Sequence, residues 1–174
     1  MRCYARIPME PIVTARLLLR EMGPDDLDFL AGMLADAEVM RYWPAPLTRE
    51  ESREWIDRQR QRYARDGCGY WLALRRDTGE PVGQAGVLML DWTGEPRPAL
   101  GYMIHRPFWR MGYATEAARA SCEFIWNVLQ QPVAWTLIRP ENEPSLAVAR
   151  RLGMTAVGSI QHYGFEHVVF ELER

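Results

Sequence analysis

The order of elements around Gly112 constrains the fold of this chain more than any other feature. Residues 99–105 (ALGYMIH) have the pattern of a strand, an irregular loop follows, and a helix begins at Gly112. Small and apolar residues recur at helical spacing as far as Leu129. The amides at a helix start lack intrahelical partners and carry the positive end of the helix dipole. Because glycine lets a backbone approach a ligand closely, the segment is suited to bind a phosphate group. A helix that simply has a glycine at its cap is an equally good interpretation.

The rest of the chain alternates between strand and helix patterns. Strands are predicted at residues 14–20, 69–76, 81–90, 99–105, 133–138, 154–160 and 163–172. Helices are predicted from Gly23–Pro24 onward, at 49–65 behind a Thr48/Glu51 capping box, at 112–129 and at 143–152. This order combines a meander with crossover connections, which predicts a mixed sheet of the α/β (α+β) class. Residues 1–13 are predicted to be an irregular tail and residues 14–174 a single domain.

Composition excludes several classes of protein. All 21 basic residues are Arg, so there is no Schiff-base or P-loop lysine, and the net charge of −2 gives no general attraction to nucleic acid. The cysteines Cys3, Cys68 and Cys122 have neither metal-ligand nor disulfide-framework spacing, so we expect no bound metal. No apolar run reaches the length of a signal or membrane segment. We therefore expect a cytoplasmic protein that binds neither nucleic acid nor membrane.

Residues 139–154 form a second informative segment. Asn142 precedes a helix and Ser145 lies in its first turn, which alone is an ordinary helix cap. Together with residues 99–116, this segment resembles the GNAT superfamily of N-acetyltransferases, in particular its ribosomal-protein-alanine N-acetyltransferase-like branch. The shared motifs are Gly101-Tyr102, Phe108-Trp109, Gly112-Tyr113-Ala114-Thr115-Glu116-Ala117, Asn142-x-x-Ser145, Leu152-Gly153-Met154 and an opening Thr14-x-Arg16-Leu17-x-Leu19-Arg20 with Pro24-x-Asp26. The resemblance spans residues 14–172.

This resemblance implies the GNAT fold and acetyl-CoA as co-substrate. The fold would be a mixed central sheet of six to seven strands, flanked by about four helices and splayed between the fourth (99–105) and fifth (133–138) strands. Amides of residues 109–114 with Thr115 would hold the diphosphate, and the strand backbone would pair with pantetheine in the splay. The residues implied to bind the cofactor are Met103, Ile104, Trp109, Arg110, Met111, Gly112, Tyr113, Ala114, Thr115, Asn142 and Ser145. The family usually carries a glycine at the position of Arg110. Related proteins are monomers or dimers, so a monomer or homodimer is implied.

The resemblance gives less guidance on the acid and the base. Many relatives use a Tyr acid where this chain has Ala149, so we expect Ser145, acting through a water, to protonate the leaving thiolate. Many relatives also carry a Glu on the strand just before the Gly-Tyr pair, and this chain does not. Asp91, Glu95 and His105 are the nearest candidates for the base.

The absence of an evident strong base favours an acceptor amine that is itself only weakly basic. An α-amine with a pKa of ~7.8 is ~14% neutral at pH 7, whereas a lysine amine with a pKa of ~10.4 is only ~0.04% neutral. The expected acceptor is therefore a protein N-terminal α-amine or a small-molecule amine. Glu116 resembles the family's helix Glu and is expected to be structural.

Acceptor specificity is expected to reside in the loops. Tyr42, Trp43, Trp92 and Tyr163 lie in the predicted loops 36–47, 91–98 and 161–166 and are candidates to line an acceptor pocket. His162 and His167 are interpreted as ordinary turn and strand residues. Two other functions stay open: a catalytically silent acyl-CoA-binding module or sensor, and a nucleotide-binding helper that uses the helix start at Gly112.

Overall fold

One mixed sheet forms the centre of the molecule. The computed structural model describes residues 9–174. Its strands are β1 (Ile12–Val13), β2 (Leu17–Arg20), β3 (Tyr70–Arg75), β4 (Pro81–Asp91), β5 (Pro96–Ile104), β6 (Val133–Ile138), β7 (Thr155–His162) and β8 (Phe165–Glu173). They lie in the order β1-β2-β3-β4-β5-β6-β8-β7. All neighbours are antiparallel except β5 and β6, which are parallel, so the predicted mixed sheet is confirmed.

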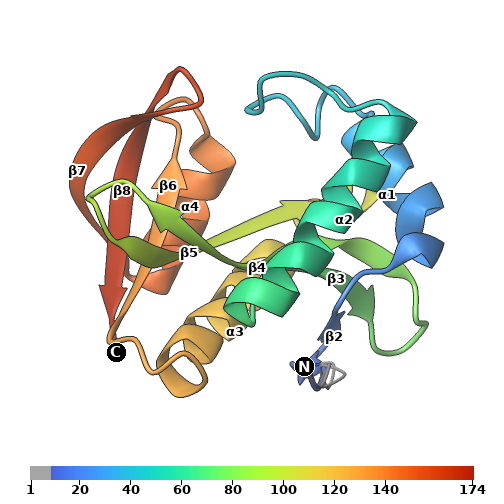
Figure 1. The fold of residues 1–174 in the computed structure, drawn as a ribbon, viewed down its shortest axis with the longest axis horizontal. Coiled ribbons are helices and arrows are strands. Elements are labelled where there is room, and N and C mark those ends of the chain that lie inside the picture. Colours follow the sequence, from blue (N-terminus) through green and yellow to red (C-terminus); the bar gives the residue numbers. More distant parts are fainter. Residues whose placement is uncertain (1–8) are drawn as a thin grey trace, which may run out of the picture.

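Four α-helices flank the sheet, as predicted. They are α1 (Leu27–Leu34), α2 (Arg49–Asp66), α3 (Tyr113–Asn127) and α4 (Glu143–Leu152), and two short 3₁₀ helices, η1 (Pro24–Asp26) and η2 (Arg106–Phe108), precede α1 and α3. In Figure 1, α1 and α2 lie on one side of the molecule, and α4 lies on the other with β6, β7 and β8. The predicted capping box of α2 is present, because Thr48 and Glu51 satisfy each other's backbone amides.

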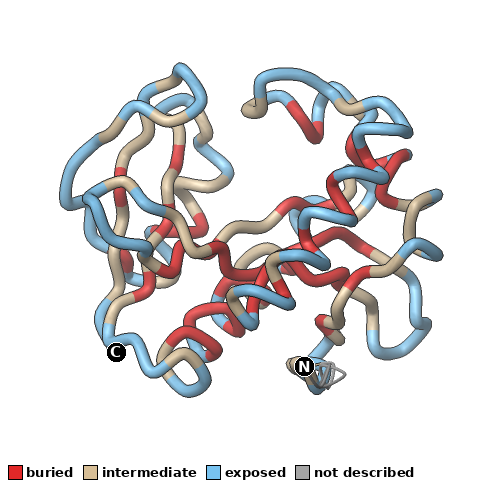
Figure 2. The backbone as a smooth tube through the Cα atoms, viewed as in Figure 1, coloured by how far each residue is buried: buried red, intermediate tan, exposed pale blue. Residues whose placement is uncertain are grey.

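The core is concentrated along α3 and the middle of the sheet (Figure 2). Trp71 of β3 is fully buried and its ring meets Phe124 of α3 edge-on, with ring centroids 4.9 Å apart. Two buried glutamines fix α2 to the sheet: Gln59 accepts the amide of Tyr70 at 3.0 Å, and Gln84 accepts the indole N–H of Trp55 at 2.9 Å. Because each of these side-chain oxygens has a donor, α2 is held in one register on the sheet.

Three expected boundaries differ from the structure. The predicted tail ends in strand β1, whose Ile12 and Val13 pair with Leu19 and Leu18, so the sheet has eight strands rather than six to seven. Residues 1–8 of that tail lie outside the described residues. The β4–β5 turn is shorter than expected, because β5 begins at Pro96. The β7–β8 turn lies at Tyr163–Gly164, both with positive φ (51° and 78°), and not at Gln161–His162.

The strands β5 and β6 are paired over only a short stretch and then separate. Ala99 and Trp135 form their one pair of register partners, and beyond it the strands diverge. This is the splay expected between residues 99–105 and 133–138, and the extra strand β1 makes these the fifth and sixth strands observed. The edge of β5 that faces away from β4 therefore lacks a strand neighbour near Met103.

Candidate functional site

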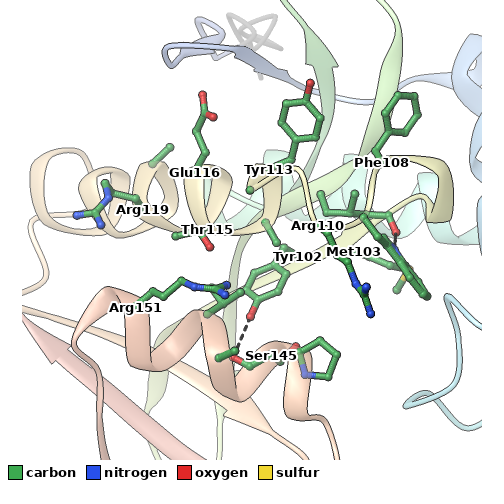
Figure 3. Close-up of a pocket in the computed structure, with 18 of the residues that line it drawn as sticks. Tyr102, Met103, Phe108, Arg110, Tyr113, Thr115, Glu116, Arg119, Ser145 and Arg151 are labelled. Carbon is green, nitrogen blue, oxygen red and sulfur yellow. Dashed lines mark hydrogen bonds between the residues drawn. The ribbon is translucent and has the colours of Figure 1, made fainter.

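A large cavity occupies the space that the splay opens. Its volume is about 1230 Å³, and it lies between the end of β5, the start of α3 and the inner face of α4. Figure 3 shows Arg110, Tyr102 and Arg151 extending into this space, whereas Tyr113 and Glu116 point away from α4. Of the residues expected to bind the cofactor, the cavity is lined by Met103, Ile104, Trp109, Arg110, Gly112, Tyr113, Ala114, Thr115, Asn142 and Ser145.

The start of α3 presents free backbone amides to this cavity. Gly112 is the N-cap, has φ of 82° and provides no side-chain cap. The amides of Tyr113, Ala114 and Thr115 therefore lack intrahelical acceptors, and all three residues line the cavity. Arg110 also adopts the left-handed region, with φ of 64°, which is uncommon for a residue other than glycine. This backbone turns the loop so that the helix start faces the cavity, an arrangement that suits an anionic ligand.

Three guanidinium groups add positive charge to the cavity. Arg110, Arg119 and Arg151 line the cavity. Within residues 9–174, no carboxylate forms an ion pair with any of the three. A guanidinium with free donors is well suited to a phosphate group.

Glu116 has a different role, because neighbouring groups occupy its carboxylate. Its oxygens accept hydrogen bonds from the Thr14 hydroxyl at 2.6 Å, the Arg16 amide at 2.7 Å and Arg16 Nε at 2.7 Å. Burial acts to raise the pKa of Glu116, but the hydrogen bonds from Thr14 and Arg16 outweigh it and hold this pKa below its ordinary value. Arg16 also donates to the carbonyl of Met111 at 2.8 Å. These contacts tie the β1–β2 connection to the loop before α3, in agreement with a structural Glu116.

The other wall is formed by α4 and the end of β5. The side-chain oxygen of Asn142 accepts the Ser145 amide at 3.2 Å, so Asn142 caps α4. The Tyr102 hydroxyl donates to the Ser145 carbonyl at 3.4 Å and bridges the splay (Figure 3). Burial raises the pKa of Tyr102 to about 12, so the phenol keeps its proton at neutral pH. The hydroxyl of Ser145 has no hydrogen-bond partner within residues 9–174, which leaves it available to a ligand.

A second, smaller cavity meets the first at these residues. Its volume is about 430 Å³, and it shares Tyr42, Trp43, Tyr102, Asn142 and Ser145 with the large cavity. Tyr163 lines the second cavity but not the first. Three of the four residues expected to contact the acceptor, Tyr42, Trp43 and Tyr163, thus line this space.

Two residues that line the second cavity were not predicted from the sequence. Tyr102 belongs to a quoted motif but was not assigned to the site; its neighbour Gly101 has no room for a side chain, since a Cβ would lie 2.3 Å from the hydroxyl oxygen of Tyr70. His162 was interpreted as a turn residue, but β7 extends to it and it lines the second cavity. Burial and the neighbouring His167 lower the pKa of His162, so its imidazole is neutral at pH 7 and able to accept a proton.

Several other expected site residues lie elsewhere. Asp91 ends β4, Glu95 lies in the β4–β5 turn, and both line neither cavity. Asp91 accepts the amides of Thr93 and Gly94 and so stabilises the turn. Trp92 packs edge-on against Trp135, with ring centroids 5.9 Å apart, and lines neither cavity. A turn of this kind can be placed near a site by sequence order, but its direction depends on the twist of β4 and β5.

Two more residues also lie outside both cavities. The half-exposed Met111 does not line the large cavity with its loop neighbours. His105, the third candidate base, packs between Phe29 and Phe108 and lines neither cavity.

The two cysteines in the described part of the chain, Cys68 and Cys122, line neither cavity. Burial raises the pKa of both Cys68 and Cys122 to about 12, so these thiols stay protonated and unreactive. Cys3 lies outside the described residues. Within residues 9–174, no group of three or more His, Cys, Asp or Glu side chains is placed to hold a metal ion. None of the helices in this part of the chain combines the length and hydropathy that a membrane span needs.

Comparison with known proteins gives a consistent result. The family model described as "Acetyltransferase (GNAT) domain" matches residues 16–155. The uncharacterized protein YkkB of Bacillus subtilis (strain 168) is 33% identical over 161 residues, which is 92% of this chain and 94% of YkkB. The crystal structure of an acetyltransferase from Agrobacterium tumefaciens str. C58 is 22% identical, has a TM-score of 0.82 and covers all of both chains (100% and 100%).

A third relative was solved with a ligand. The RimL ribosomal alpha-N-protein acetyltransferase in complex with coenzyme A is 18% identical, with a TM-score of 0.78 over 94% of this chain and 98% of that one. At these identities the two solved structures show a common fold, while the family model and YkkB show common descent. This chain therefore belongs to the GNAT acetyltransferase family and is an acyltransferase.

Proposed function

We propose that this protein transfers an acetyl group from acetyl-CoA to a primary amine of a small molecule or a protein N-terminus. The observation that carries the proposal is the meeting of two cavities at Tyr102, Asn142 and Ser145. One cavity combines free helix amides, unpaired arginines and an open strand edge, which suits a phosphate-bearing and amide-bearing ligand such as acetyl-CoA. The coenzyme A complex of RimL, a protein of the same fold, supports this assignment.

In this proposal each wall of the large cavity binds one part of acetyl-CoA. The amides at the start of α3, with Arg110, hold the diphosphate, and Met103 offers its backbone to the pantetheine arm. The carbonyl of Ile104 already accepts the indole N–H of Trp109 at 2.7 Å, so it is less available to that arm. The thioester then lies near Ser145, at the junction with the second cavity.

The transfer itself needs a neutral amine and a protonated leaving group. The amine nitrogen attacks the thioester carbonyl, a C–N bond forms, and the C–S bond breaks to release a thiolate. His162 takes the proton that the amine loses, because its lowered pKa keeps it neutral at pH 7. The Ser145 hydroxyl, directly or through a water, relays a proton to the thiolate and is itself reprotonated from solvent; the ordinary thiol pKa of ~8.5 makes the thiolate a good leaving group. The products are an N-acetyl amide and free CoA.

A first experiment separates this function from the alternatives. Isothermal titration with acetyl-CoA and with ATP tests the large cavity, and thiol release with a panel of amines tests the transfer. Binding of acetyl-CoA but not ATP, together with amine-dependent thiol release, is the expected result. Preferential ATP binding would instead support a nucleotide-binding helper and contradict the proposal.

A catalytically silent acyl-CoA-binding module is the second candidate. The observation in its favour is that Asp91 and Glu95 lie away from the cavities and that, among the described residues, no carboxylate lines the second cavity. Tight acetyl-CoA binding without thiol release for any small amine or N-terminal peptide would establish this alternative.

A further inference from the structure

The second cavity is positively charged. Arg58, Arg62 and Arg139 line it, and none of the described residues that line it is Asp or Glu. This composition is unusual for a site that must receive an amine, because a protonated amine is itself a cation and is repelled by guanidinium groups. The positive charge of the second cavity therefore limits which charges the acceptor can carry.

The three arginines are only partly neutralised by residues outside the cavity. Arg58 lies 3.5 Å from a carboxylate oxygen of Glu54, and both side chains are about half exposed. Arg139 Nε lies 3.4 Å from Glu141 without hydrogen-bond geometry, and this buried Nε has no hydrogen-bond partner. Within residues 9–174, no carboxylate pairs with Arg62. The cavity thus keeps guanidinium donors for a ligand.

Aromatic rings hold two of these guanidinium groups in place. Arg139 lies 4.0 Å above the ring centroid of Phe165, and Arg58 lies 5.7 Å from that of Trp55. Trp55 in turn stacks on Tyr70 at 5.8 Å. Stacked, pre-oriented guanidinium groups lose little side-chain entropy when they bind a carboxylate or phosphate.

We propose that the acceptor is a small molecule that carries both the primary amine and an anionic group, a carboxylate or a phosphate. The anion binds Arg62 and Arg139, and the amine reaches the junction at Tyr102 and Ser145. This inference rests on the proposed function. The volume of about 430 Å³ is in the range of small-molecule sites and leaves little room for a folded protein segment.

The same arginines help the amine to react. A positive environment disfavours the ammonium form and so lowers the pKa of the bound amine. The anion of the acceptor offsets the repulsion that would otherwise prevent binding. The neutral nitrogen attacks the acetyl carbonyl and forms the C–N bond, its excess proton passes to His162, the C–S bond breaks, and the released thiolate is protonated to CoA. A purely cationic amine gains the lower pKa but has nothing to bind the arginines.

Paired acceptors test the inference by thiol release. Phenylalanine is compared with 2-phenylethylamine, and O-phosphoethanolamine with ethanolamine, so that each pair differs in one anionic group, carboxylate or phosphate. We expect at least one acceptor with an anionic group to have a kcat/KM about tenfold or more above that of its partner without that group. Equal or faster transfer to 2-phenylethylamine and ethanolamine, which lack the anionic group, would overturn the inference and leave the proposed function intact.

Two further outcomes are distinguishable. Faster transfer to peptides with an acidic second residue than to any small amine would overturn the small-molecule assignment. If acetyl-CoA binds but none of the tested amines gives thiol release, both the proposed function and the inference are overturned.

Arginine variants then test the wall itself. In Arg62→Gln, the KM for the favoured anionic amine is expected to rise about tenfold, while the KM for its partner without the anionic group does not rise and the KM for acetyl-CoA stays unchanged. Arg60→Gln is the matched control, because Arg60 lies on the same helix, pairs with Asp57 at 3.4 Å and lines neither cavity. If Arg62→Gln raises the KM equally for acceptors with and without the anionic group, the proposed recognition of the anion by these arginines is wrong.

Discussion

At the scale of single residues, the loop before α3 depends on two positions in the left-handed region. Gly112 adopts this conformation without cost, whereas Arg110 adopts it with a side chain. The sequence indicated a glycine at the helix start, but the conformation of Arg110 could not be derived from it, because Arg is ordinarily excluded from positive φ. The only signal was that relatives usually carry glycine at that position.

Gly112→Val is expected to abolish or strongly weaken acetyl-CoA binding. Valine is strained at φ of 82°, so the amides at the start of α3 would turn away from the cavity. Titration calorimetry measures the change. Gly94→Val is the matched control, because Gly94 has φ of 94° in the β4–β5 turn and lines neither cavity. Equal acetyl-CoA affinity of the two variants would refute the assignment of this loop.

Ser145→Ala is expected to lower kcat more than it changes acetyl-CoA affinity. Only the hydroxyl is lost, since the contacts of Ser145 with Asn142 and Tyr102 use its backbone. Steady-state kinetics and calorimetry on the same preparation measure both quantities. A large loss of affinity with unchanged kcat would remove Ser145 as the proton donor and make it a binding residue.

At the scale of elements, Glu116 connects parts of the chain that are distant in sequence. It joins the first turn of α3 to Thr14 and Arg16, which lie between β1 and β2. Strand β1 was not predicted, because two residues carry no periodic pattern and its pairing depends on where β2 lies in the sheet. The longer elements were predicted well, since their hydrophobic periodicity and caps are local properties.

Glu116→Gln is expected to lower the melting temperature by about 2–8 °C, the equivalent of about 1–2 kcal/mol for hydrogen bonds to a charged group that is partly exposed. The pKa of Glu116 is lowered on folding, so its contribution is present above the unfolded pKa of about 4.3 and is lost as the pH falls through the folded pKa. Melting curves at several pH values measure this. Glu123→Gln, on the same helix, serves as the control; a difference between the two variants that persisted at low pH would contradict the assigned role.

At the scale of the whole molecule, the site is assembled from segments that span most of the chain. Tyr42, Tyr102, Ser145 and His162 lie on separate elements and meet at or line the second cavity. The loop that we propose to bind the cofactor is contiguous in sequence, so its residues could be predicted from a motif. For the second cavity the sequence pointed to the loop aromatics Tyr42, Trp43 and Tyr163, but not to His162 or the arginines, because their proximity depends on the direction in which the loops and the β7–β8 hairpin fold back.

His162→Gln is expected to change the pH dependence of kcat/KM. In the wild type, protonation of His162 adds to protonation of the amine, so the rate falls more steeply with decreasing pH below the lowered pKa of His162. Without the imidazole only the amine's own titration remains, and the profile is shallower and lower. His105→Gln is the comparison, because His105 lines neither cavity. Identical profiles for the wild type and His162→Gln would exclude His162 as the proton acceptor.

The single pair of register partners between β5 and β6 divides the sheet into a first unit, β1–β5, and a second unit, β6–β8. Ala99 and Trp135 are its only register partners, so hydrogen bonds within the sheet barely couple β1–β5 to β6–β8. The second unit carries α4, and with it Asn142 and Ser145, while α3 packs against both units. Because Asn142 and Ser145 line both cavities, any displacement of α4 and its three strands would change the shape of both at once. The position of β6–β8 against β1–β5 therefore sets the room available to two different ligands.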